Sequence, residues 1–139
     1  MSRGALTSRS RPKLFSIAAL VFVATDALWL GVVAPRFYQA TIGGLLREQP
    51  DLLAAALFYV LFVIGVCEFV VIPAAPAVRF ARVFGRGALF GLVAYATFDL
   101  TAMAVLRGWS WLVTVVDLAW GMLLTGTVAA VTHRLAIRR

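Results

Sequence analysis

The sequence predicts an all-α integral membrane protein, a single domain over residues 1–139 arranged as an antiparallel, up-down four-helix bundle. Two observations support this prediction. Hydrophobic residues make up 63% of the chain and charged residues 14%, whereas soluble domains have roughly 45–50% and about 25%. Apolar residues also form four runs of about the 20 residues that a membrane-spanning helix needs, at positions 14–34, 52–72, 87–106 and 110–131.

Prolines and charged residues separate the four runs. The first run lies between Pro12 and Pro35, and the second lies between Pro50 and Pro73. A basic segment precedes the first run, as in a signal peptide. This run is longer than the roughly 7–15 apolar residues of a signal peptide, and it contains Asp26. We therefore expect it to be retained as a helix.

The basic residues predict the orientation. Ten of them fall on one side of the four spans: Arg3, Arg9, Arg11, Lys13, Arg79, Arg82, Arg86, Arg134, Arg138 and Arg139. Only Arg36, Arg47 and Arg107 fall on the other side. Cytoplasmic connections carry the excess of basic residues, so we expect both termini in the cytoplasm. The membrane is expected to be the inner membrane of the cell. The same pattern explains the net charge of +7 without nucleic acid as a partner.

The connection between the first two spans, residues 35–51, permits two interpretations. Phe37, Tyr38, Ile42 and Leu45 alternate with polar residues in a way that fits a short helix in the headgroup region. An ordinary loop fits equally well. The sequence leaves the choice open.

Each predicted span contains one acidic residue: Asp26, Glu68, Asp99 and Asp117. At a rise of 1.5 Å per residue, Asp26 and Asp99 lie about 18 Å from the cytoplasmic ends of their spans, and Asp117 lies about 21 Å from that side. Glu68 lies only about 7 Å from it. Three acids are thus expected in one layer in the outer half of the bilayer. Such residues usually face the interior of a bundle and mark function.

Aromatic residues accompany the three acids. Tyr95 precedes Asp99 by four residues and shares its helix face, so we expect its hydroxyl to reach that carboxyl group. Trp29 and Trp120 each follow an aspartate by three residues. The same Asp-x-x-Trp pattern therefore occurs in the first and fourth spans, which are expected to run in opposite directions. It permits two interpretations, an inverted repeat or two independent placements of an interfacial Trp.

No Lys or Arg lies inside the four predicted spans. Three acids in one low-dielectric layer cannot all be ionised without cations. They must be partly protonated, share protons through hydrogen bonds, or bind a cation from outside. The competing interpretation is that protonated acids only lock the helices together. Because four helices make a thin wall, we expect any conduction to require a homo-oligomer.

Other chemistries have little support. The single histidine, His133, lies at the end of the last span, and Cys67 has no partner for a disulfide. We expect no metal and no cofactor, because phosphate-binding and nucleophile motifs are also missing. Whether the protein is an enzyme stays open, since paired acids can perform acid–base chemistry on a lipid.

Several short motifs resemble a family of small bacterial inner-membrane proteins that is catalogued as a domain of unknown function. They are Asp26-x-x-Trp29-Leu30-Gly31, Phe58-Tyr59, the stretch Tyr95-Ala96-Thr97-Phe98-Asp99-Leu100-Thr101, and Asp117-x-x-Trp120-Gly121. In that family the third motif often reads Tyr-Asp-Leu-Thr-Asn, so Phe98 and Ala102 remove two polar groups here. The resemblance implies the fold and the membrane location, draws attention to the same acids and to Tyr59, and implies no activity.

We therefore expect a carboxylate-lined polar pocket formed by Asp26, Trp29, Tyr95, Asp99, Asp117 and Trp120, with Glu68 and Tyr59 as secondary residues. Membrane lipid surrounds it, and the ligand is a proton, a small cation or the headgroup of an amphiphile. The alternatives are a membrane-embedded enzyme, or a partner of one, that acts on lipid, and a structural scaffold.

Overall fold

The structure, a computed structural model, describes residues 10–137, and within that range it contains helices and no strands. Its helical elements are α1 (Ser10–Leu28), the π-helical turn η1 (Trp29–Val33), α2 (Ala34–Ile42), the 3-10 turn η2 (Gly43–Leu45), α3 (Leu52–Val66), the π-helical turn η3 (Cys67–Val71), α4 (Phe80–Val105) and α5 (Trp111–Ala136). Four bases of the predicted cytoplasmic flanks, Arg3, Arg9, Arg138 and Arg139, lie outside the described residues.

Four helical stretches are long and apolar enough to cross a membrane: Ser10–Leu45, Leu52–Val71, Phe80–Val105 and Trp111–Ala136. Their outer surfaces are apolar as well. Leu20, Leu53 and Phe69 are each more than 70% exposed. Exposing such a side chain to water instead of an apolar environment costs roughly 1.5–3 kcal/mol of free energy. The all-helical, membrane-spanning class predicted from the sequence is confirmed.

The first helical stretch is longer than predicted. The chain stays helical through Pro35, although proline has no backbone N–H to donate to the preceding turn. The π-helical turn η1 lies directly before the proline. In this wider turn the Ala34 N–H donates to the Trp29 carbonyl oxygen. α2 then continues to Ile42. Of the two interpretations left open for residues 35–51, the helical one describes the first part of this connection.

The third and fourth spans also extend past their apolar runs, whereas the second, Leu52–Val71, agrees with the expected 52–72 to within one residue. α4 begins at Phe80 instead of residue 87, and α5 ends at Ala136 instead of residue 131. Hydropathy marks where apolar residues stop, whereas helical hydrogen bonding continues into the basic flanks. Arg82 and Arg86 are therefore helical residues, contrary to the expected boundary.

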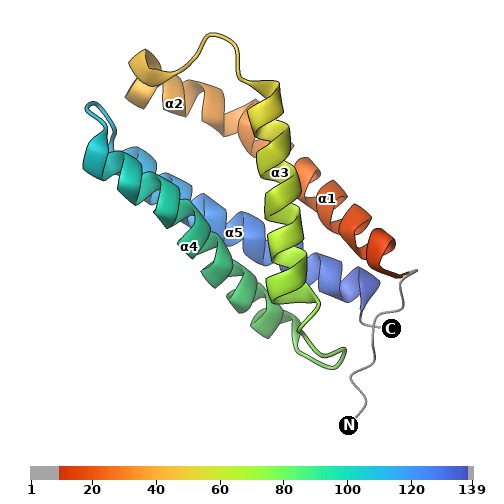
Figure 1. Ribbon diagram of the computed structural model, residues 1–139. Coiled ribbons are helices and arrows are strands. Elements are labelled where there is room, and N and C mark those ends of the chain that lie inside the picture. Colours follow the sequence, from red (N-terminus) through yellow and green to blue (C-terminus); the bar gives the residue numbers. More distant parts are fainter. Residues whose placement is uncertain (1–9, 138–139) are drawn as a thin grey trace.

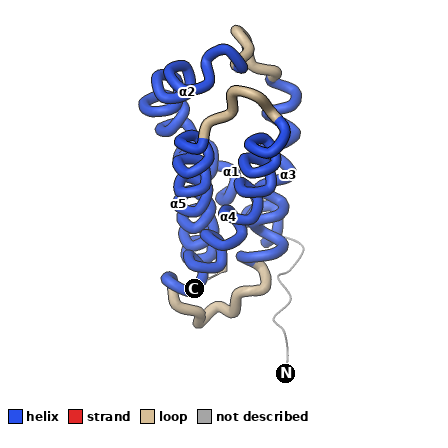
Figure 2. The backbone as a smooth tube through the Cα atoms, turned by 90° about the vertical axis from the view of Figure 1, so that its left-hand side faces the viewer, coloured by secondary structure: helices blue, strands red, loops and turns tan. Residues whose placement is uncertain are grey.

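The helices form a bundle around α5. α4 lies alongside α5, α1 packs against α5 and α3 contacts α1. In both views α2 lies across one end of the bundle, beside the connection between α4 and α5 (Figures 1 and 2). η2 reaches that connection, because a Cβ atom on Gly108 would lie 4.0 Å from Leu45 Cδ1.

Glycines bring α4 and α5 together. A Cβ atom on Gly91 would lie 2.1 Å from the Gly121 carbonyl oxygen, and one on Gly121 would lie 2.5 Å from the Tyr95 ring. Small residues at such positions allow the backbones of membrane helices to pack closely. The helix that approaches Gly91 is α5.

The apolar core occupies the half of the bundle away from α2. It contains Leu14 and Phe22 of α1, Val66 of α3, and Leu124 and Val128 of α5, all fully buried. The polar residues described next lie in the other half, so the bundle is divided into an apolar layer and a polar layer.

Candidate functional site in the polar half of the bundle

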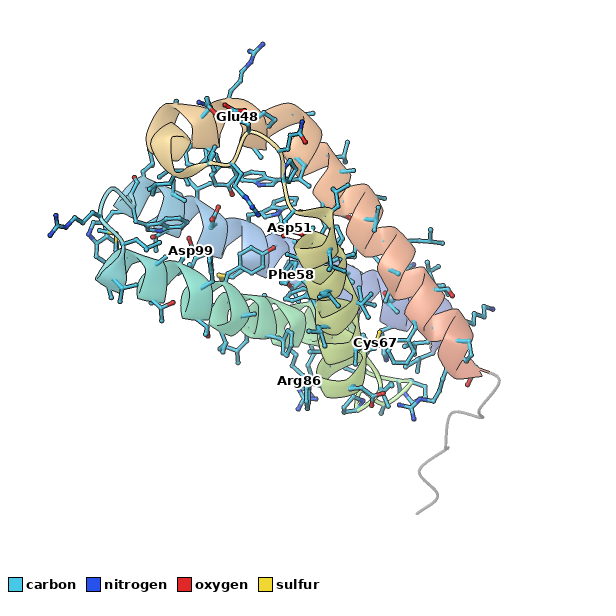
Figure 3. The ribbon with its side chains drawn as sticks, turned by 45° about the horizontal axis from the view of Figure 1, so that its top comes forward. Glu48, Asp51, Phe58, Cys67, Arg86 and Asp99 are labelled. Carbon is cyan, nitrogen blue, oxygen red and sulfur yellow. The ribbon has the colours of Figure 1, made fainter. Side chains whose placement is uncertain are left out.

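Three carboxyl groups from three helices are buried. Asp26 of α1 is 8% exposed, Asp99 of α4 is 0% exposed and Asp117 of α5 is 7% exposed. Figure 3 shows Asp99 near the end of α4 that lies below α2, whereas Arg86 of the same helix lies toward the opposite end. The three acids that the helical rise predicts in one layer are therefore all buried among the helices.

Tyr59 of α3 provides a partner for Asp26. Its hydroxyl donates a hydrogen bond to Asp26 Oδ2 over 2.6 Å, and its ring packs edge-on against Phe22 with centroids 5.0 Å apart. α3 thus contributes a hydroxyl to the polar layer, although its own acid, Glu68, does not lie there. Tyr59 was predicted as a secondary residue only.

Tyr38 of α2 provides a partner for Asp117. The Tyr38 hydroxyl donates a hydrogen bond to Asp117 Oδ1, and the Trp29 side chain lies close enough to interact with the same hydroxyl. Sequence reasoning assigned Tyr38 to the headgroup region and missed it as a site residue. The available signal was its place in an amphipathic segment that directly follows the span carrying Asp26.

Asp99 differs from the other two acids. Neither of its carboxyl oxygens receives a hydrogen bond from a donor among the described residues. Asp117 is close enough for a hydrogen bond if one carboxyl group of the pair carries a proton. Asp99 and Asp117 therefore form a buried pair of acids on adjacent helices.

Tyr95 does not hydrogen-bond Asp99, contrary to the expectation from their spacing. Side chains on a helix lean toward its N-terminus, so the Tyr95 ring points back along α4 and packs on Gly121. Its hydroxyl interacts electrostatically with all three acids. Tyr95 therefore belongs to the same polar layer without a hydrogen bond to Asp99.

Trp29 and Trp120 meet in the same layer. Their rings are stacked, with centroids 4.7 Å apart and an angle of 11° between the planes. The buried Trp120 Nε1 has no hydrogen-bond partner among the described residues. The two Asp-x-x-Trp segments of the sequence therefore contact each other through their indoles, which both an inverted repeat and independent placement allow.

Glu68 belongs to a different region. It forms an ion pair with Arg11, and both side chains are substantially exposed at the far end of α3. His133 hydrogen-bonds the Ala75 carbonyl oxygen at this same end, over 3.1 Å, and Cys67 is buried in the apolar core. Among residues 10–137, no three His, Cys, Asp or Glu side chains are placed to hold a metal ion.

Residues 12–134 match the protein family described as "Predicted membrane protein (DUF2177)". The chain belongs to this family. The resemblance seen in the Asp26, Asp99 and Asp117 motifs is thereby confirmed. No curated protein and no solved structure shows a significant match to the chain.

The polar layer of this family member contains the three carboxyl groups, three tyrosine hydroxyls and two indoles described above. No Lys or Arg side chain forms an ion pair with any of these three acids in the described residues. Buried carboxylates require compensation, and hydroxyl donors provide it for Asp26 and Asp117. Chemically, the layer can hold a proton between carboxyl groups, pass it between oxygens, or attract an external cation.

Proposed function

We propose that this protein binds or translocates a proton in the layer formed by Asp26, Asp99 and Asp117. The same layer could serve a small cation or the headgroup of an amphiphile in place of the proton. The supporting observation is Asp99, which is fully buried and has no donor except a protonated Asp117. Two adjacent carboxyl groups in a low-dielectric site cannot both be ionised. A proton shared between them is the simplest compensation.

A continuous set of oxygen atoms supports proton transfer rather than simple packing. Asp99 is next to Asp117, and Asp117 accepts a hydrogen bond from Tyr38. Tyr38 belongs to α2, at the end of the bundle, and is partly exposed. Protons move between hydrogen-bonded groups at such separations, and acid chains inside membrane spans are common in proton relays.

We also propose the topology. The helices alternate in direction, both termini are cytoplasmic and the membrane is the bacterial inner membrane. The ten-to-three distribution of bases supports this orientation. The Arg11–Glu68 and His133–Ala75 contacts support it too, because they bring together the start of α1, the end of α3 and the end of α5. The acid layer then lies in the outer half of the bilayer.

Proton flux into lipid vesicles tests the function. Purified protein is reconstituted with a pH-sensitive dye inside, and a potassium diffusion potential is imposed with valinomycin. We expect the wild type to conduct and Asp99→Asn to lower the rate at least about tenfold, because a carboxamide cannot carry the proton.

Glu48→Gln is the matched control, because it neutralises an exposed acid in the connection between η2 and α3, whereas Asp99 is buried in α4 (Figure 3). It should keep the wild-type rate. A wild-type flux no faster than that of empty vesicles, or a full rate in Asp99→Asn, would contradict the proposed function.

A further inference from the structure

A groove runs between α1 and α3, on the apolar side of the acid layer. Its volume is about 400 Å³, within the range of small-molecule sites. Six of its lining residues are Phe15, Ala19 and Phe22 of α1 and Tyr59, Val63 and Ile64 of α3. Both walls belong to membrane-spanning stretches, so a molecule dissolved in the bilayer can enter from the side.

One wall of the groove carries a polar contact. Tyr59 lines the groove, and its hydroxyl donates to Asp26, which is buried and is not itself a lining residue. A groove that only held a hydrocarbon chain would gain nothing from a tyrosine hydroxyl bound to a buried carboxyl group, since burying such a group is costly. The pair thus points to a ligand with an apolar body and a polar end.

Charge identifies that polar end. None of the groove-lining residues carries a charge, and Asp26 has a hydroxyl partner but no ion pair among the described residues. The nearby Arg11 is engaged by Glu68. Phe15, Phe22 and Tyr59 also present aromatic rings, and aromatic faces attract ammonium groups. A cation complements this site, whereas an anion would be repelled.

We propose that the groove between α1 and α3 binds an amphiphilic cation, with its hydrocarbon chain along the groove and its ammonium group beside Tyr59, the lining residue that contacts Asp26. The inference rests on the proposed function in one respect, namely that the acid layer handles charge, and it names the substrate class. Binding needs Asp26, while the proposed proton transfer needs Asp99 and Asp117.

Binding of matched ligands to the full chain in lipid nanodiscs tests the proposal by titration calorimetry. The probes are decyltrimethylammonium, decanol and decyl sulfate, which share a chain and differ in the charge of the headgroup. We expect saturable binding of the cation only. Asp26→Asn should weaken that binding at least about tenfold, because it removes the negative charge that the Tyr59 hydroxyl contacts. Its side-chain oxygen can still accept from Tyr59, so the bundle should fold.

Two further variants complete the design. Ala19→Trp fills the groove without touching an acid and should also abolish cation binding, while Glu48→Gln should leave it unchanged. Equal binding of all three probes, unaltered binding in Asp26→Asn, or no binding to the wild type would overturn the proposal. Loss of proton flux in Asp99→Asn would still support the proposed function in each of these cases, so the two ideas fail separately.

Discussion

Each buried acid in the polar layer has a different partner. Asp26 and Asp117 accept hydrogen bonds from Tyr59 and Tyr38, whereas Asp99 has only its acidic neighbour. A hydroxyl donor stabilises a carboxylate without adding charge. At the scale of residues, the layer therefore consists of two acids with hydroxyl donors and one acid that receives no hydrogen bond from the described residues.

Tyr38→Phe tests the contribution of α2 to this layer. The variant removes the donor to Asp117 and keeps the ring, so we expect stability to fall by about 0.6–1 kcal/mol and proton flux to fall as well. Thr41→Val is the matched control, because the Thr41 hydroxyl donates only to carbonyls of its own helix. Thermal melting in detergent and vesicle flux give the two readouts. Equal flux in Tyr38→Phe and wild type would remove Tyr38 from the pathway.

At the scale of elements, the glycines of α4 and α5 determine how precisely Tyr95 is placed. Tyr95 occupies the space that a side chain at Gly121 would fill. The close approach at Gly91 agrees with the general preference for small residues at helix contacts in membranes. The direction of Tyr95 follows from the lean of helical side chains, which spacing along the sequence does not include.

Gly121→Ala should therefore disturb the site as well as the packing. The added Cβ atom would lie 2.5 Å from the Tyr95 ring, and overpacking of this kind costs about 1–3 kcal/mol. Gly85→Ala is the control on the same helix pair, since nothing lies within 4 Å of its added Cβ atom. We expect the melting temperature to fall in Gly121→Ala and to hold or rise in Gly85→Ala. A melting temperature in Gly121→Ala equal to that of the wild type would contradict the close contact.

Among the helix boundaries, the continuation of α1 into α2 was the least well predicted from the sequence. Hydropathy ends the span at residue 34, and Pro35 normally stops a helix. The π-helical turn at η1 resolves the conflict locally, and no simple residue pattern announces such a turn. For this reason the burial of Asp26, Asp99 and Asp117 among the helices was predictable from the sequence, while the contact of Tyr38 with Asp117 was not.

At the scale of the whole molecule, the bundle separates an apolar half from a polar half. The apolar core lies at the end with Arg11 and His133, and the acid layer lies toward α2. In the topology proposed above, the basic end faces the cytoplasm. The acid layer then lies in the outer half of the bilayer, and the apolar core lies on its cytoplasmic side.

Reporter fusions test this orientation. A reporter that works only in the cytoplasm should be active at both termini, and one that works only outside should be inactive there. A cysteine introduced at Gln49 should react with a membrane-impermeant thiol reagent added from the outside. A cysteine at Ala75 is the control on the opposite face and should be protected in intact cells. Labelling at Ala75 without labelling at Gln49 would reverse the assignment of both faces.

The central claim is that Asp99 and Asp117 hold a proton together inside the membrane. Infrared difference spectroscopy of the protein in lipid measures it most directly, because a protonated carboxyl group has a C=O stretch that a carboxylate lacks. We predict a protonated carboxyl band in the wild type at neutral bulk pH, which weakens or shifts in Asp99→Asn and Asp117→Asn and is unchanged in Glu48→Gln. A spectrum without this band, or one that both aspartate variants leave unaltered, would contradict the claim.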